Sequence, residues 1–364
     1  MSDQSLRDAC DTFFHGHRQQ TAAQSFHAMA TWCEARQIAH DHYGEGELIQ
    51  AFENEIAALC GFPAGLFCMT GTMAQLVALQ VACQNKRLDV VGVHASAHLL
   101  LHENSNYQFL RQFKTMTIGE PFRPWLAADL HKIVDPLAAV LYELPMREIG
   151  AQMPSWQELN ELKAACHARD VHLHMDGARL WEAATGYGRP LAQVCAGFDS
   201  CYVSFYKGIG GLGGAMLLGS QDFIARAKLG IKRLGGNIVQ RSPYVVAAAM
   251  QLEQRLADMP RYFARTQELY HLLAQFPSLR VNPERPQCNM LHLYLPASVE
   301  RCHAVRDQIA KEEKAWLFGL ARNTALPQQA MLEWYVGDNL LTLPLPRIEQ
   351  LLQRLVDGLA EAEA

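Results

Sequence analysis

The 364-residue sequence has no hydrophobic run that approaches the length of a membrane-spanning helix. Its ten cysteines are scattered singly, so neither a zinc site nor a disulfide framework is indicated. The net charge of −5 argues against nucleic acid or an anionic membrane as the main partner. No apolar segment typical of a secretory signal stands near the N-terminus. We therefore expect a cytoplasmic protein without a metal site.

What the sequence does have is a globular composition, with 49% hydrophobic and 19% charged residues. The chain is longer than one ordinary core needs, which predicts a large and a smaller folded part. No internal repeat or low-complexity tract is present. We expect an N-terminal lead-in segment (1–44), a large domain (45–243), and a bridging helix followed by a small C-terminal domain (244–364).

Short apolar strands alternate with helices in the middle of the chain, which predicts an α/β fold with a mostly parallel sheet. The C-terminal part instead predicts helices on a small sheet, an α+β arrangement. A long helical pattern over 244–276 is expected to break at Pro260. Strands are predicted at 66–69, 89–93, 114–118, 138–142, 171–175, 215–218, 290–295 and 331–336. Helices are predicted at 47–60, 73–83, 126–134, 159–169, 222–232, 299–311 and 347–361.

Two charged residues mark the ends of neighbouring strands. Asp176 ends the apolar strand 171–175, and Lys207 lies just past a second strand-like segment, against a glycine-rich turn. Parallel strands joined by a helix end on one edge of the sheet, where α/β folds bind ligands. Singly, each residue would suit an ordinary polar pair. Together they suit pyridoxal phosphate, because a lysine forms the Schiff base and an acid keeps the pyridine nitrogen protonated.

A tight turn, Thr70-Gly71-Thr72, leads from strand 66–69 into helix 73–83. Backbone N–H groups at a helix start, beside hydroxyls and a glycine that permits close approach, form an anion site. A plain helix N-cap explains the same residues.

The glycines at positions 208 to 214 could suggest a dinucleotide loop. That fingerprint requires a helix directly after the glycines. Here they lead straight into strand 215–218. The pattern therefore disfavours a nicotinamide oxidoreductase, and indicates a backbone that passes close to a cofactor beside Lys207.

The Asp176-Gly177-Ala178-Arg179 and Ser204-x-x-Lys207-Gly208 patterns closely resemble low-specificity L-threonine aldolases. These belong to the aromatic amino acid β-eliminating lyase/threonine aldolase family. The resemblance is strongest from Asp41 to Gly219. It implies PLP fold type I, with a large domain built on a mostly parallel seven-stranded sheet and a smaller C-terminal α+β domain.

The same resemblance implies residue roles around the cofactor. Lys207, Asp176 and His98 are expected to be catalytic, with the imidazole of His98 stacked on the cofactor ring. The turn Thr70-Gly71-Thr72 is expected to hold the phosphate. Arg241 is a candidate for the phosphate or for a subunit contact.

Further expectations concern the substrate and a neighbouring subunit. Arg179 is expected at the substrate carboxylate and the cofactor edge. Related enzymes bring an arginine that binds the substrate carboxylate from the C-terminal domain, and Arg322 is the candidate for it here. Tyr43 is a further substrate-binding candidate. It falls in a segment that family members place near the neighbouring subunit's active site, so a homodimer or homotetramer is expected.

One segment departs from the family. Threonine aldolases usually carry Glu-Asn-Thr-His where this chain has Glu143-Leu144-Pro145-Met146. That histidine is thought to help handle the β-hydroxyl. We expect cleavage of a β-hydroxy-α-amino acid to glycine and an aldehyde. β-Elimination to a 2-oxo acid and ammonia is the alternative, and a non-catalytic cofactor carrier is a third hypothesis.

Overall fold

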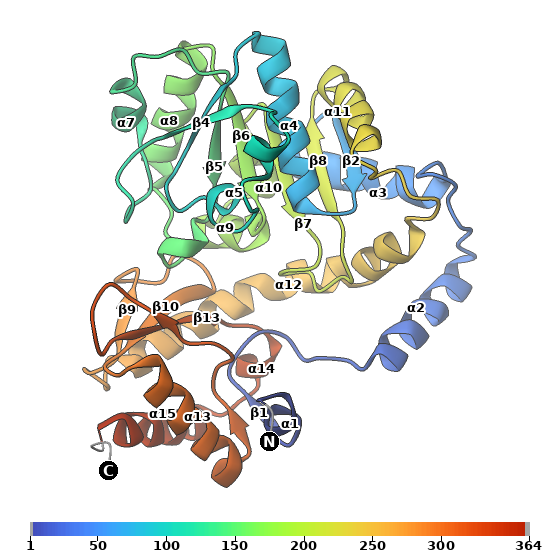
Figure 1. Ribbon diagram of the computed structural model, residues 1–364. Helices are drawn as coiled ribbons and strands as arrows, with labels where there is room; N and C mark the ends of the chain where they lie inside the picture. The colour runs from blue at the N-terminus through green and yellow to red at the C-terminus, as the bar shows by residue number, and fades with distance from the viewer. Residues whose placement is uncertain (1–2, 361–364) are drawn as a thin grey trace. The chain divides into compact units, whose positions relative to one another are not determined.

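The computed structural model describes residues 3–360, and the chain forms two compact units. The larger unit comprises residues 20–148 and 152–257. The described residues of the smaller unit are 3–19, 149–151 and 258–360. Figure 1 shows the sheets and helices of both units.

The larger unit is built on a seven-stranded sheet, as expected. Its strand order is β2-β8-β7-β6-β5-β3-β4, and only β8 runs antiparallel to its neighbours. The strands are β2 (Ala64–Cys68), β3 (Val90–Val93), β4 (Lys114–Thr117), β5 (Ala139–Glu143), β6 (His172–Gly177), β7 (Ser200–Ser204) and β8 (Ala215–Gly219). The predicted α/β fold class is confirmed.

Helices cover both faces of this sheet, which explains why every residue of β5, β6 and β7 is buried. Leu66 and Leu217 pack on α4 and α11 in one cluster. Phe67 points to the opposite face, where Phe205 stacks on it and also contacts Phe52 of α3. The helices of this unit are α2 (Ala22–Arg36), α3 (Glu47–Cys60), α4 (Gly71–Lys86), α5 (His98–Leu101), α6 (Asn106–Phe109), α7 (Ala127–His131), α8 (Trp156–Ala168), α9 (Leu180–Tyr187), α10 (Leu191–Cys195) and α11 (Gln221–Arg233).

The smaller unit is an α+β layer, as predicted. Its antiparallel sheet has the order β12-β13-β10-β9. Helix α15 (Leu345–Ala360) buries an apolar stripe of Ile348, Leu351, Leu352 and Leu355, spaced at three and four residues. The remaining elements are α1 (Asp3–Asp8), β1 (Thr12–Phe13), β9 (Arg280–Asn282), β10 (Met290–Leu295), α13 (Val299–Glu313), β11 (Ala315–Trp316), β12 (Arg322–Asn323), β13 (Ala330–Tyr335) and α14 (Asp338–Leu341).

The expected helix break at Pro260 is wrong. Helix α12 runs from Ser242 to Leu273 with Pro260 inside it. A proline removes one backbone donor, but the flanking Met259 and Tyr262 are fully buried, so side-chain packing keeps the segment helical. None of the helices between residues 3 and 360 has both the length and the apolar content needed to cross a membrane.

Candidate active site

The C-terminal ends of β5, β6 and β7 bring three ionisable side chains to one edge of the large sheet. Glu143 on β5 lies opposite Asp176 on β6. Lys207 follows β7 by three residues and is half-buried. The parallel pairing of β5, β6 and β7 therefore puts Asp176 and Lys207 at the same edge of the sheet. Glu143 adds a third charge that the sequence patterns did not assign to the site.

Asp176 is a buried acid, with 2% of its surface exposed. Its Oδ2 accepts a hydrogen bond of 2.8 Å from Nε2 of Gln75 on α4, and its Oδ1 accepts one of 3.0 Å from the N–H of Ala178. Neither donor is a cation, and within residues 3–360 Asp176 forms no ion pair. Burying a carboxylate without a cation is costly. The carboxylate of Asp176 is therefore suited to pair with a positively charged group such as a pyridinium nitrogen.

Sequence reasoning missed Gln75. The signal was present, because Gln75 is a polar residue on the buried face of α4, flanked by the apolar Ala74 and Leu76. The Oε1 atom of Gln75 has no hydrogen-bond partner among the described residues. A second polar atom beside Asp176 can therefore still accept a hydrogen bond.

The Thr70-Gly71-Thr72 turn starts α4, as expected. The Thr70 side chain accepts a hydrogen bond of 3.2 Å from the N–H of Met73. A Cβ atom added to Gly71 would lie 2.1 Å from the hydroxyl oxygen of Tyr202, so only glycine fits there. The first N–H groups of a helix have no intrahelical acceptor and favour an anion. The turn thus fits a phosphate group.

His98 begins α5, and two carboxylates hold it. Its Nδ1 lies 3.0 Å from Oε1 of Glu103, which is buried and also accepts a hydrogen bond of 2.9 Å from Asn106. The backbone N–H of His98 donates to Oε2 of Glu143 over 3.2 Å. Glu143 therefore connects the edge that holds Asp176 to the histidine expected over the cofactor ring. The role of Glu103, five residues after His98, is to orient that imidazole.

The electrostatics of this edge suit proton transfer near neutral pH. Burial and the neighbouring charge of Asp176 raise the pKa of Glu143 to about 7. The backbone N–H groups of Arg147 and His98 and the charge of Lys207 act in the opposite direction and lower this pKa.

Lys207 experiences a similar balance. Burial and the charge of Arg179, which caps α9, lower the pKa of Lys207, whereas the charges of Asp176 and Glu143 raise it. A lysine with a lowered pKa is more often the neutral amine that can attack a carbonyl carbon. The charge of Arg179 thus acts on Lys207, and the predicted contacts of Arg179 with the substrate carboxylate and the cofactor edge stay predictions.

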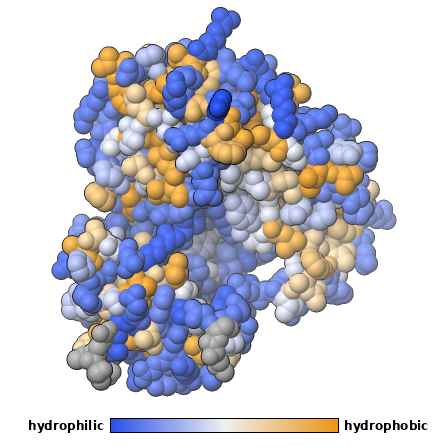
Figure 2. All heavy atoms as spheres, in the orientation of Figure 1, coloured by the Kyte–Doolittle hydropathy of each residue, from blue (hydrophilic) through white to orange (hydrophobic). Residues whose placement is uncertain are grey.

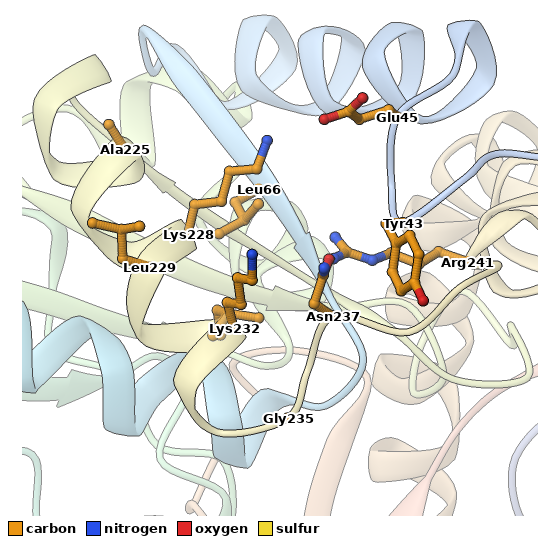
Figure 3. Close-up of a pocket in the computed structure, with 11 residues that line it drawn as sticks. Tyr43, Glu45, Leu66, Ala225, Lys228, Leu229, Lys232, Gly235, Asn237 and Arg241 are labelled. Carbon is orange, nitrogen blue, oxygen red and sulfur yellow. The ribbon is translucent and has the colours of Figure 1, made fainter.

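Arg241 and Tyr43 lie together in a cleft of the large unit that has a volume of about 710 Å³ (Figure 3). Arg241 is buried, donating to the carbonyl of Phe67 over 3.2 Å and to Oδ1 of Asn237 over 2.6 Å. Gly44 packs directly on its guanidinium group.

Two lysines, Lys228 and Lys232, project into this cleft from α11 (Figure 3). The described residues that line the cleft do not include Lys207, Asp176 or His98. The proposed contact of Arg241 with the cofactor phosphate therefore stays a prediction. Arg322 lies on β12 of the smaller unit, and its role in substrate binding also stays a prediction.

The fold and the site together define a pyridoxal-phosphate-dependent lyase of fold type I. A family model for the beta-eliminating lyases matches residues 18–295, and the chain belongs to that family. The low-specificity L-threonine aldolase 1 of Arabidopsis thaliana is 28% identical over 72% of this chain and 75% of its own length. The Escherichia coli low specificity L-threonine aldolase is 29% identical over 66% of this chain and 74% of its own length.

Solved structures support the same relationship. A Listeria monocytogenes protein assigned as an L-allo-threonine aldolase superposes with a TM-score of 0.91 and 31% identity, covering 98% of this chain and 99% of the other. The Leishmania major threonine aldolase has a TM-score of 0.74 at 17% identity, which shows a common fold. Pyridoxal phosphate is the cofactor that this family implies, and Asp176, Lys207 and the Thr70 turn fit its ring nitrogen, carbonyl carbon and phosphate.

Proposed function

We propose that this enzyme cleaves a β-hydroxy-α-amino acid of the threonine or allo-threonine type into glycine and an aldehyde. The observation that carries the proposal is the group of Lys207, Asp176 and His98 at one sheet edge, in a chain that matches an L-allo-threonine aldolase structure over nearly its whole length. The departure at Leu144–Met146 keeps β-elimination as the alternative, but the threonine aldolase relatives favour aldol cleavage.

Each residue of the site has a task in this reaction. The bound cofactor supplies an electron-withdrawing ring that accepts the electron pair released at Cα. Lys207 provides the amine for the covalent link, and its lowered pKa favours the reactive neutral form. Asp176, held by Gln75 and Ala178, keeps a negative charge at the ring nitrogen.

The imidazole of His98 is proposed to stack on one face of the cofactor ring, close to the reacting groups of the substrate. Glu103 accepts a hydrogen bond at Nδ1, so the opposite nitrogen, Nε2, presents a lone pair. Arg179, and Arg322 of the smaller unit, are the proposed contacts of the substrate carboxylate, since a guanidinium fork matches a carboxylate.

We also propose a homodimer or homotetramer. Large apolar side chains are exposed on the large unit, among them Phe26, Leu229 and Val239, and Figure 2 shows apolar residues lying among hydrophilic ones. Tyr43 is half-exposed at the cleft of Figure 3, where a neighbouring subunit would cover it. All ten cysteines are free, which is consistent with a reducing compartment such as the cytoplasm.

The test is product analysis of the purified holoenzyme with L-threonine and L-allo-threonine. We expect glycine and acetaldehyde in equal amounts. A 2-oxo acid and ammonia from the same substrates would instead establish the β-eliminating reaction. Loss of the visible absorbance of the cofactor on treatment with borohydride distinguishes both from a chain that binds no pyridoxal phosphate.

A further inference from the structure

A second histidine lies beside His98. His102 follows it by one helical turn at the end of α5, and the ring centroids are 5.1 Å apart at an interplanar angle of 46°. Residues four apart on a helix share a face, so both imidazoles project from the same side. The pattern of the sequence did not mark His102.

His102 is held by residues that directly follow the segment that departs from the family pattern. Its Nε2 lies 2.8 Å from Oε1 of Glu148, and the same oxygen accepts a hydrogen bond of 2.8 Å from Nη1 of Arg147. Glu148 and Arg147 follow Glu143, whose carboxylate contacts the backbone of His98. The residues after β5 thus fix an imidazole that comes from α5.

The hydrogen bond to Glu148 determines the protonation of the neutral ring. A carboxylate accepts, so Nε2 of His102 carries the hydrogen and Nδ1 carries a lone pair. Within residues 3–360, Nδ1 of His102 has no hydrogen-bond partner. The side chain of His102 is 34% exposed, compared with 14% for Glu148, and its ring lies beside that of His98. Its arrangement repeats that of His98 with Glu103: one nitrogen is tied to a carboxylate, and the other is open as a base.

We propose that Nδ1 of His102 is the base that accepts the proton of the substrate's Cβ hydroxyl. The proposal rests on the function proposed above. The O–H bond breaks toward His102, its electron pair forms the C=O bond of the aldehyde, and the Cα–Cβ electron pair stays with Cα. A proton then adds to Cα to give glycine, so the reaction needs no further reactant.

This proposal accounts for the missing Asn-Thr-His residues after Glu143. The chain has Leu144, Pro145 and Met146 there, of which Leu144 and Met146 are fully buried and none can transfer a proton. In their place Glu148 and Arg147 position His102. Glu148 is therefore a positioning residue, whereas His102 touches the substrate.

The experiment compares His102→Phe with a matched histidine variant, His131→Phe. Phenylalanine keeps the ring contact with His98 but has no nitrogen. His131 ends α7 and is exposed. We expect His102→Phe to lower kcat for aldol cleavage by about 100-fold, the typical contribution of a general base. Exchange of the α-hydrogen of glycine in D2O, which requires the cofactor but no Cβ hydroxyl, should be unchanged. Added imidazole should partly restore the rate of His102→Ala.

A second measurement does not depend on turnover. Nitrogen-15 NMR of histidine-labelled holoenzyme, with the His102→Phe spectrum for assignment, should show the Nε2–H tautomer for His102. A wild-type cleavage rate in His102→Phe, or an Nδ1–H tautomer, overturns the role of His102 and leaves the aldolase function intact. Absence of glycine and aldehyde with the wild-type enzyme overturns the proposed function itself, and the role of His102 with it.

Discussion

Gln75 and Asp176 are joined by a buried hydrogen bond of 2.8 Å, although 101 positions separate them in the chain. The amide comes from the first turns of α4 and the carboxylate from the end of β6. The same helix therefore begins at the Thr70-Gly71-Thr72 turn and also carries the amide that binds the acid. This bond joins the start of α4 to the end of β6.

Removing this bond should weaken cofactor binding. Asp176 accepts hydrogen bonds from Gln75 and from the N–H of Ala178, and Gln75→Leu removes the first of these two. A hydrogen bond to a charged group is worth about 1.5–3 kcal/mol, so the affinity for pyridoxal phosphate should fall roughly 10- to 100-fold. Titration of the cofactor-free protein, followed by visible absorbance, measures this. Gln84→Leu, exposed near the end of α4, is the control and should bind normally.

Lys207 should be the residue that carries the cofactor. Lys207→Ala should lose the visible absorbance of bound pyridoxal phosphate while its circular dichroism stays that of the folded protein, because the side chain is only half-buried. Borohydride reduction of the wild type, followed by peptide mapping, should label Lys207. A label on Lys228, which is exposed in the cleft of Figure 3, would show that the cofactor binds elsewhere.

Glu143 should make stability depend on pH. Its pKa is raised to about 7 in the folded protein, above the usual value near 4.5 for the unfolded chain. The folded state thus binds this proton more tightly than the unfolded state does. The stabilisation that results is fully present below about pH 4.5 and is lost as the pH rises toward 7.

Glu143→Gln removes this titration. The free energy of unfolding of the wild type minus that of Glu143→Gln should therefore decrease from pH 5 to pH 8, by an amount on the order of 3 kcal/mol at most. Urea unfolding of both proteins at both pH values measures this difference. An increase in the difference would mean that Glu143 is stabilised as the charged form.

Gly71 should tolerate no side chain. A Cβ atom there would lie 2.1 Å from the Tyr202 hydroxyl oxygen, so Gly71→Ala must displace the turn or the ring. We expect a loss of stability of about 1–3 kcal/mol and weaker cofactor binding. Gly319→Ala serves as the control, because no atom lies within 4 Å of the added methyl group. Thermal unfolding and cofactor titration of both variants compare the effects.

Local sequence was sufficient for the parts of the site that depend on neighbouring positions. The apolar run ending at Asp176, the lysine after β7 and the turn before α4 each follow from short-range patterns of strand, helix and glycine. These patterns, with the family resemblance, led to the cofactor, the fold class and the reaction. The family match and the similar structures confirm these three predictions.

Tertiary structure decided which residues surround those groups. The partners of the site come from distant segments: Gln75 meets Asp176, Glu143 meets His98, and Glu148 meets His102. Strand order also could not be read locally, since β8 inserts antiparallel between β2 and β7. Polarity and periodicity indicate that a residue will be buried or will end a strand. They do not indicate which donor it will face, because that depends on how strands pair and helices pack across the whole unit.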